Sequence, residues 1–88
     1  MYDDAMQSGL VEQTLRTWRD GERLLEELAP LSADHQTMRL LLVELRESYQ
    51  MLTSRSDVSH QQLDECAKQL AVARNTIENV RSKLASDS

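Results

Sequence analysis

Apolar residues recur every three or four positions along most of this chain, which is the spacing of one face of an α-helix. From Leu31 to Leu84 they follow the alternating steps of a heptad repeat without a change of phase. The positions of this seam are Leu31, His35, Met38, Leu42, Leu45, Tyr49, Leu52, Ser56, Ser59, Leu63, Cys66, Leu70, Ala73, Ile77, Val80 and Leu84. Two helices separated by a loop would share one phase only by chance, so the seam favours one continuous helix.

A second apolar face precedes the seam. On a helix it covers roughly half of the circumference, so more than one neighbouring element has to cover it. Its residues are Met6, Leu10, Val11, Leu15, Trp18, Leu24, Leu25 and Leu28. Gly21 weakens this helix by up to ~1 kcal/mol relative to Ala and is a candidate for a close helix crossing. We expect a first helix over about residues 3–28.

One firm break follows this helix. Pro30 disfavours helical geometry at Ala29 and cannot continue the hydrogen-bond ladder, while Ser32 is well placed to cap the next helix. A turn as short as residues 29–32 leaves the flanking helices antiparallel. The sequence therefore predicts an αα-hairpin.

Residues 52–63 carry signals for and against a second break. Residues 52–63, LTSRSDVSHQQL, contain four Ser or Thr residues but neither Gly nor Pro. Ser59 and Gln62 have the spacing of a capping box, which would start a new helix. Ser in a helix costs only about half a kcal/mol, however, so we expect a long helix over about 33–85. The alternative is a break at 53–59.

These patterns predict a single all-α domain over residues 1–88. We expect a short first helix folded against a long second one, with the exposed half of the long helix pairing with another chain in a coiled-coil or helical-bundle dimer. The alternative is an up-down-up three-helix bundle. The residues expected to carry packing and self-association are Trp18, Leu25, Leu42, Leu45, Tyr49, Leu52, Leu63, Leu70, Ile77 and Val80. Leu40, Val43 and Met51 project from the opposite side of the long helix and form a candidate partner face.

Charge and composition exclude several classes of function. The net charge is −5, and seven acidic but only three basic residues fall within residues 1–30. Nucleic-acid binding needs a clustered basic face, so no nucleic-acid partner is expected. No apolar run approaches the ~20 residues of a membrane span. Cys66 is the only cysteine, which excludes an internal disulfide and favours a reducing, cytoplasmic setting.

The sequence contains no recognisable motif for a catalytic site or a metal site. His35 and His60 lie far apart in the sequence, and neither pairs with Cys66 at the close spacing that zinc sites use. Phosphate loops and nucleophile elbows are absent. We therefore expect no enzyme activity, no cofactor, no metal and no small-molecule substrate.

Residues 15–28, LRTWRDGERLLEEL, place a Trp on an apolar face followed by leucines at helical spacing. This stretch resembles the first helix of a spectrin repeat, a three-helix bundle found in cytoskeletal linkers, and the resemblance implies the alternative fold. The function expected first is a non-catalytic oligomerisation or scaffold segment of a larger intracellular protein. The alternative is a monomeric three-helix module, a cytoskeletal linker or adaptor, that receives a partner helix.

Overall fold

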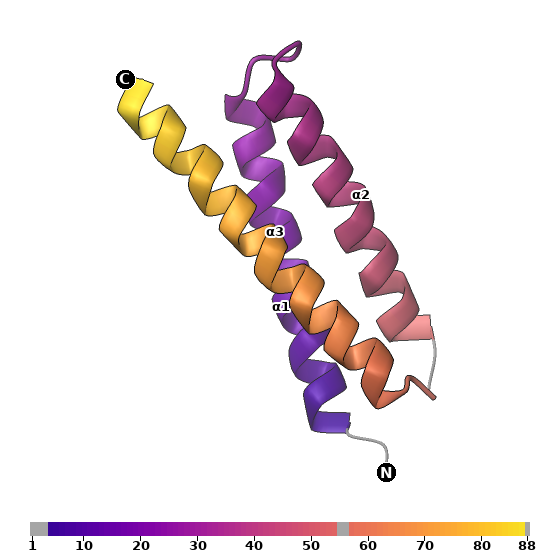
Figure 1. Ribbon diagram of the computed structural model, residues 1–88. Helices are drawn as coiled ribbons and strands as arrows, with labels where there is room; N and C mark the ends of the chain where they lie inside the picture. Colours follow the sequence, from indigo (N-terminus) through magenta and orange to yellow (C-terminus); the bar gives the residue numbers. More distant parts are fainter. Residues whose placement is uncertain (1–3, 55–56, 88) are drawn as a thin grey trace.

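A computed structural model describes residues 4–54 and 57–87. These residues form three α-helices, α1 (Asp4–Glu27), α2 (Ala33–Ser54) and α3 (His60–Asp87), and no strand. The helices run up, down and up along an elongated bundle that measures 49 × 19 × 16 Å (Figure 1). The chain is therefore all-helical, and the up-down-up bundle describes its fold.

The single helix expected over residues 33–85 does not form. The chain turns back between Ser54 and His60, so α3 returns alongside the other helices instead of extending α2 (Figure 1). A continuous phase was compatible with this reversal because α2 and α3 each bury the same seam positions within one bundle. The shared phase reflects two separate amphipathic helices.

Local chemistry at Ser59 explains where α3 starts. The Gln62 backbone N–H donates to Ser59 Oγ at 3.2 Å, and the Ser59 backbone N–H donates to Gln62 Oε1 at 3.0 Å. This reciprocal pair is the capping box. Val58, just before the cap, is only 3% exposed and belongs to the same buried cluster as Leu63. A cap with buried apolar residues on both sides fixes the entry of the chain into α3.

The start of α2 is also capped. The His35 backbone N–H donates to Ser32 Oγ at 3.2 Å, which satisfies one of the helix N–H groups that has no partner inside the helix. Pro30 lies between the end of α1 and this cap. The short connection therefore has a defined stop and a defined start.

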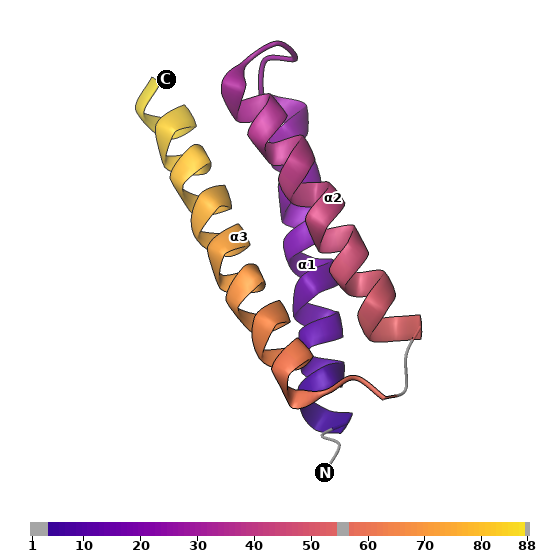
Figure 2. The same cartoon turned by 45° about the vertical axis from the view of Figure 1, so that its right-hand side comes forward.

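α1 is the central helix of the bundle. It packs most extensively along α2 and next along α3, whereas α2 and α3 touch least. Figures 1 and 2 both show the C-terminal half of α3 diverging from α2. Polar contacts bridge these two helices: Ser48 Oγ donates to Gln69 Oε1 at 2.9 Å, and Lys83 Nζ lies 3.8 Å from Asp34 Oδ1.

The seam of α2 and α3 is buried inside the chain's own core. Two clusters of buried apolar side chains, one toward each end of the bundle, take up these positions. The buried seam residues are Met38, Leu42, Leu45, Leu52, Leu63, Cys66, Leu70, Ala73, Ile77 and Val80. The sequence pattern suggested that the seam residues of the long helix pack against a second chain. In the structure they pack against other helices of the same chain.

α1 buries a different stripe from the one its apolar residues suggest. Its buried positions follow heptad spacing but are largely small or polar: Gln7, Leu10, Thr14, Thr17, Gly21, Leu24 and Leu28. Small side chains at the centre of this stripe let α1 lie close to both of its neighbours. The larger apolar residues Val11, Leu15 and Trp18 are displaced to the flank, where they are half-buried.

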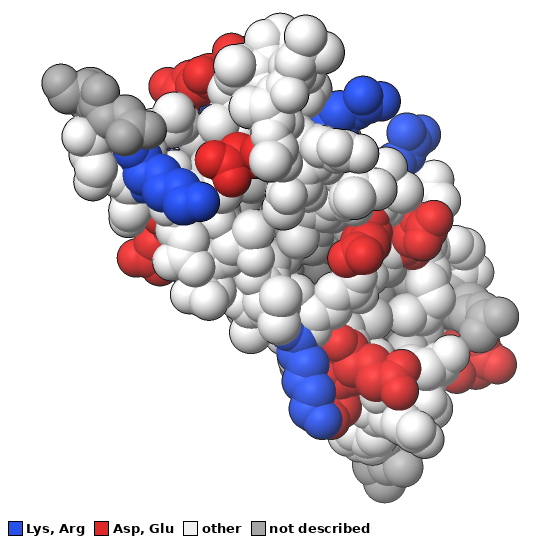
Figure 3. All heavy atoms as spheres, turned by 45° about the horizontal axis from the view of Figure 1, so that its top comes forward, with Lys and Arg blue, Asp and Glu red and all other residues white. Residues whose placement is uncertain are grey.

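The surface carries no patch of a single sign on the face shown in Figure 3, where acidic and basic side chains are interspersed among uncharged ones. Over the described residues, none of the three helices combines the length and the apolar character needed to cross a bilayer.

Candidate functional site

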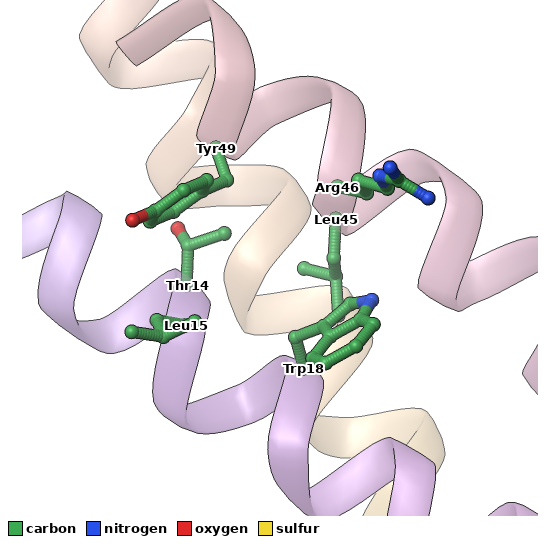
Figure 4. A pocket seen from close by; sticks show the side chains of 6 residues that line it. All are labelled: Thr14, Leu15, Trp18, Leu45, Arg46 and Tyr49. Atoms are coloured by element: carbon green, nitrogen blue, oxygen red, sulfur yellow. The ribbon is translucent and has the colours of Figure 1, made fainter. Parts of the chain in front are cut away.

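The displaced apolar residues of α1 form one strip along the helix. Val11, Leu15 and Trp18 are spaced by four and three residues, so they lie above one another on the same face. This face borders α2, since the pockets that these side chains line are otherwise completed only by α1 and α2 residues. The result is a groove on the side of the α1–α2 pair that faces away from α3 (Figure 4).

One part of the groove is an apolar pocket of about 370 Å³ between α1 and α2. Trp18 stands on α1 and Tyr49 on α2 at its two ends, and Leu45 reaches from α2 toward Trp18 (Figure 4). Arg46 lies at the edge, with its guanidinium directed outward (Figure 4). The lining residues are Thr14, Leu15, Trp18, Leu45, Arg46 and Tyr49. We call this the Trp18–Tyr49 pocket.

A second hollow of about 500 Å³ continues the groove toward the start of α1. Leu15 lines both hollows, so they are consecutive parts of one surface feature. The lining residues of the second hollow are Gln7, Ser8, Val11, Glu12, Leu15, Leu52 and Thr53. Together the two hollows are the α1–α2 groove, which extends over about 15 Å of α1 at 1.5 Å per residue.

Most residues expected to mediate self-association are buried inside the bundle. Seven of them are at most 8% exposed: Leu42, Leu45, Leu52, Leu63, Leu70, Ile77 and Val80. Leu25 is half-buried against the second core cluster. Trp18 and Tyr49 are half-buried too, and the structure brings this pair together in one pocket.

The residues expected to form a partner face are not equivalent. Leu40 and Val43 are 62% and 55% exposed on α2. Met51 is half-buried and packs against the first core cluster. The exposed part of that expected face is therefore reduced to Leu40 and Val43.

Sequence reasoning did not single out Leu15, Val11 or Arg46 as groove residues. A signal was present, because the apolar face of the first helix is much broader than one buried stripe needs. That excess width predicts a half-exposed apolar strip. It does not reveal which edge of the face remains at the surface, because Thr14 and Thr17 occupy buried positions that their polarity argues against.

Charges on the two walls of the groove differ in how they are compensated. On α1, Glu12 Oε1 lies 3.2 Å from the Arg16 guanidinium. Farther along the same wall, Arg19 and Glu22 follow Leu15 and Trp18 by one helical turn and are of opposite sign. On α2, Arg46 forms no ion pair with any carboxylate in the described part of the chain.

The cysteine thiol and the two imidazoles lie apart from the groove. Burial raises the pKa of the Cys66 thiol, and a hydrogen bond with Ser48 lowers it by less. His35 and His60 lie at opposite ends of the bundle (Figure 1). Within residues 4–54 and 57–87 no three His, Cys, Asp or Glu side chains come together in a way that could hold a metal ion. The groove is suited to binding an apolar side chain between two aromatic rings.

No protein-family model, curated protein or solved structure matches this chain.

Proposed function

We propose that this chain is a non-catalytic protein–protein interaction module whose α1–α2 groove receives an amphipathic helix. One observation carries the proposal: both aromatic side chains of the described residues, Trp18 and Tyr49, line a single surface pocket. Neither is a buried core residue. The core is instead built from aliphatic and sulfur-containing side chains.

The residue types in the pocket support binding. Trp, Tyr and Arg are the residues most enriched among those that dominate binding energy at protein interfaces, and the Trp18–Tyr49 pocket has one of each. Large aromatic side chains that remain half-exposed leave apolar area in contact with water. A partner that covers them removes this area, at about 25 cal/mol for each Å² buried.

The shape of the groove supports a helical partner. α1 and α2 are antiparallel neighbours, and the hollow between two such helices is the place that a further helix takes in a four-helix bundle. An occupant would place apolar residues at steps of three and four against Val11, Leu15 and Trp18. The partner helix would then cover the part of the broad apolar face of α1 that α2 and α3 leave exposed.

Self-association is the second candidate function, and it needs a surface other than the seam. Leu40 and Val43 favour self-association because they are two large apolar residues, one helical turn apart, that are exposed to solvent on α2. In either role the chain would act as an adaptor or scaffold segment. A single reduced cysteine fits a cytoplasmic protein.

Photo-crosslinking tests the proposed groove in the cell that makes the protein. A photoreactive phenylalanine analogue is placed at position 15, in the groove, and in a matched variant at position 75, which is exposed on α3. We expect a discrete protein adduct from position 15 and none of that mass from position 75. Absence of an adduct at position 15, or the same adducts from both positions, would refute the groove as a docking site.

A further inference from the structure

We infer that the helix received by the groove carries carboxylates on the flank that lies over α2, where they pair with Arg46 and Arg39. This inference rests on the proposed function and adds the chemistry of the partner. It follows from two arginines of α2 that pair with no carboxylate of residues 4–54 and 57–87.

Arg46 is the only charged residue among those that line the Trp18–Tyr49 pocket. On a helix, an ion-pair partner would stand three or four residues away. Those positions around Arg46 are Leu42, Val43, Tyr49 and Gln50, and none is acidic. The helix therefore provides no carboxylate for this guanidinium.

Arg39 repeats the same arrangement seven residues earlier. Its neighbours at three and four residues are His35, Gln36, Leu42 and Val43, which again include no acid. Residues seven apart lie on one strip of a helix, about 10.5 Å apart along its axis. Arg39 and Arg46 thus form an exposed basic strip on α2. Arg46 lines the groove, and Arg39 lies farther toward the start of α2, beyond the Trp18 end of the groove.

Other charged residues of the bundle show what compensation looks like. Arg16 pairs with Glu12 and Lys68 pairs with Asp64, each at 3.2 Å and each four residues apart. Lys83 reaches Asp34 on another helix. Arg39 and Arg46 differ from these cations because neither has an acid three or four residues away, and Arg46 lines the one pocket that holds both aromatic rings.

The spacing of the two arginines defines the partner. A helix that inserts a large apolar residue between Trp18 and Tyr49 would carry one carboxylate a turn from that residue, within reach of Arg46. A second carboxylate seven residues away would reach Arg39. Guanidinium groups bind carboxylates through two parallel hydrogen bonds, so the pairs also fix the position of the helix along the groove.

Two synthetic helical peptides test the inference. Both have Leu at the a and d positions of three heptads and no Trp. One has Glu and the other Lys at every e and g position, so that reversing the peptide leaves its charges unchanged. Trp18 is the only tryptophan of the chain, and its emission reports directly on the pocket.

We expect the Glu peptide to shift Trp18 emission to shorter wavelength and to bind about tenfold more tightly than the Lys peptide at low salt. The protein has a net charge of −5, so non-specific attraction would favour the Lys peptide instead. A preference for Glu therefore reports the local strip. Raising the salt concentration should reduce this preference.

Charge-reversal variants provide the control. Arg46→Glu should remove or invert the preference, whereas Arg74→Glu on α3 changes the net charge equally and should leave it intact. Both residues are exposed, and Arg46→Gln repeats the test without introducing a new charge. Thermal melts followed by circular dichroism establish that each variant is folded.

The outcomes separate the inference from the function on which it rests. Equal affinity for the two peptides, or tighter binding of Lys, overturns the acidic partner while the groove remains a docking site. Absence of any emission change with either peptide overturns both. A shift that depends on protein concentration alone, with a mass twice the 10.1 kDa of the chain, would show a second copy in the groove and overturn the inference.

Discussion

Gly21 of α1 lies so close to Leu42 of α2 that a Cβ atom at Gly21 would stand 2.8 Å from Leu42 Cδ2. The same Cβ would be 3.6 Å from Ile77 Cδ1 of α3 and from Met38 Sδ of α2. All three helices therefore meet at this glycine. Side chains of the neighbouring helices occupy the space that a side chain at position 21 would need. This close packing explains why a glycine stands in the middle of α1, although glycine weakens a helix.

Gly21→Ala should destabilise the protein, whereas Gly9→Ala should stabilise it. Each substitution gains up to ~1 kcal/mol of helix propensity in α1. A Cβ at Gly9 meets nothing within 4 Å, so that gain is kept. At Gly21 the buried Leu42 side chain must shift, at a cost of about 1–3 kcal/mol. Urea unfolding measures the free energy of unfolding of both variants. Equal stabilisation by the two would show that the helix crossing at Gly21 accommodates a Cβ atom without strain.

Gln7→Met should destabilise the end of α2. Gln7 Nε2 donates to the Leu52 carbonyl at 2.6 Å, and that carbonyl lies in the last turn of α2, where no helical N–H is available to it. Met has a similar volume but no donor, so a loss of about 1–3 kcal/mol is expected.

Gln13→Met is the matched control for this substitution, because Gln13 is exposed on the same helix. It should change the free energy of unfolding by less than about 0.5 kcal/mol. Hydrogen exchange at the C-terminal end of α2 should speed up in the Gln7 variant alone. Identical losses in both variants would mean that the Gln7 hydrogen bond contributes nothing.

How much the sequence predicts can be judged at Ser59, Leu45 and Thr17. The heptad phase identified the buried positions of α2 and α3, including Leu45, because amphipathic spacing depends only on local geometry. The heptad phase did not show whether these residues pack against helices of the same chain or against a second chain. A capping box at Ser59 and a continuous phase across it are both local signals, and their competition is decided by tertiary contacts such as the burial of Val58.

The groove was the harder feature to predict. Thr17 and Thr14 are polar and yet buried, whereas Leu15 and Trp18 are apolar and half-exposed. Hydrophobicity alone assigns these positions the wrong way round. What decides between them is side-chain volume at the close crossing near Gly21, which is a property of three helices together and not of the first one.

Ser59→Ala should destabilise the bundle by about 1 kcal/mol, because it removes the acceptor of the Gln62 backbone N–H. Gln62→Ala should cost less, and the double variant should cost less than the two losses added together, since the two side chains form one reciprocal unit. Ser82→Ala, on the exposed surface of α3, should be close to neutral. Strict additivity in urea unfolding would contradict the capping box.

Stability should fall as the pH rises past the ordinary thiol pKa of 9.0, in part because of Cys66. Burial raises the pKa of this thiol in the folded state, so the unfolded chain loses its proton at lower pH than the folded one. The contribution of Cys66 is therefore fully present below pH 9.0 and is lost as the pH rises through the folded value.

Unfolding free energies at about pH 8 and about pH 10 provide the measurement, with Cys66→Ala as the reference. The parent chain should lose more stability over this interval than the Ala variant, in which only the other groups titrate. A thiol reagent should also modify folded Cys66 more slowly than the urea-unfolded chain. If the two proteins lost the same stability, the thiol would have no folded-state shift.

The central place of α1 also bears on how the molecule assembles during synthesis. α1 and α2 leave the ribosome first and share the most extensive contact, so a hairpin can form while the last helix is still being made. α3 then arrives on a template built mainly by α1. A nascent chain halted after residue 54 would hold the α1–α2 groove complete while leaving the opposite flank of α1, with Thr17, open to water.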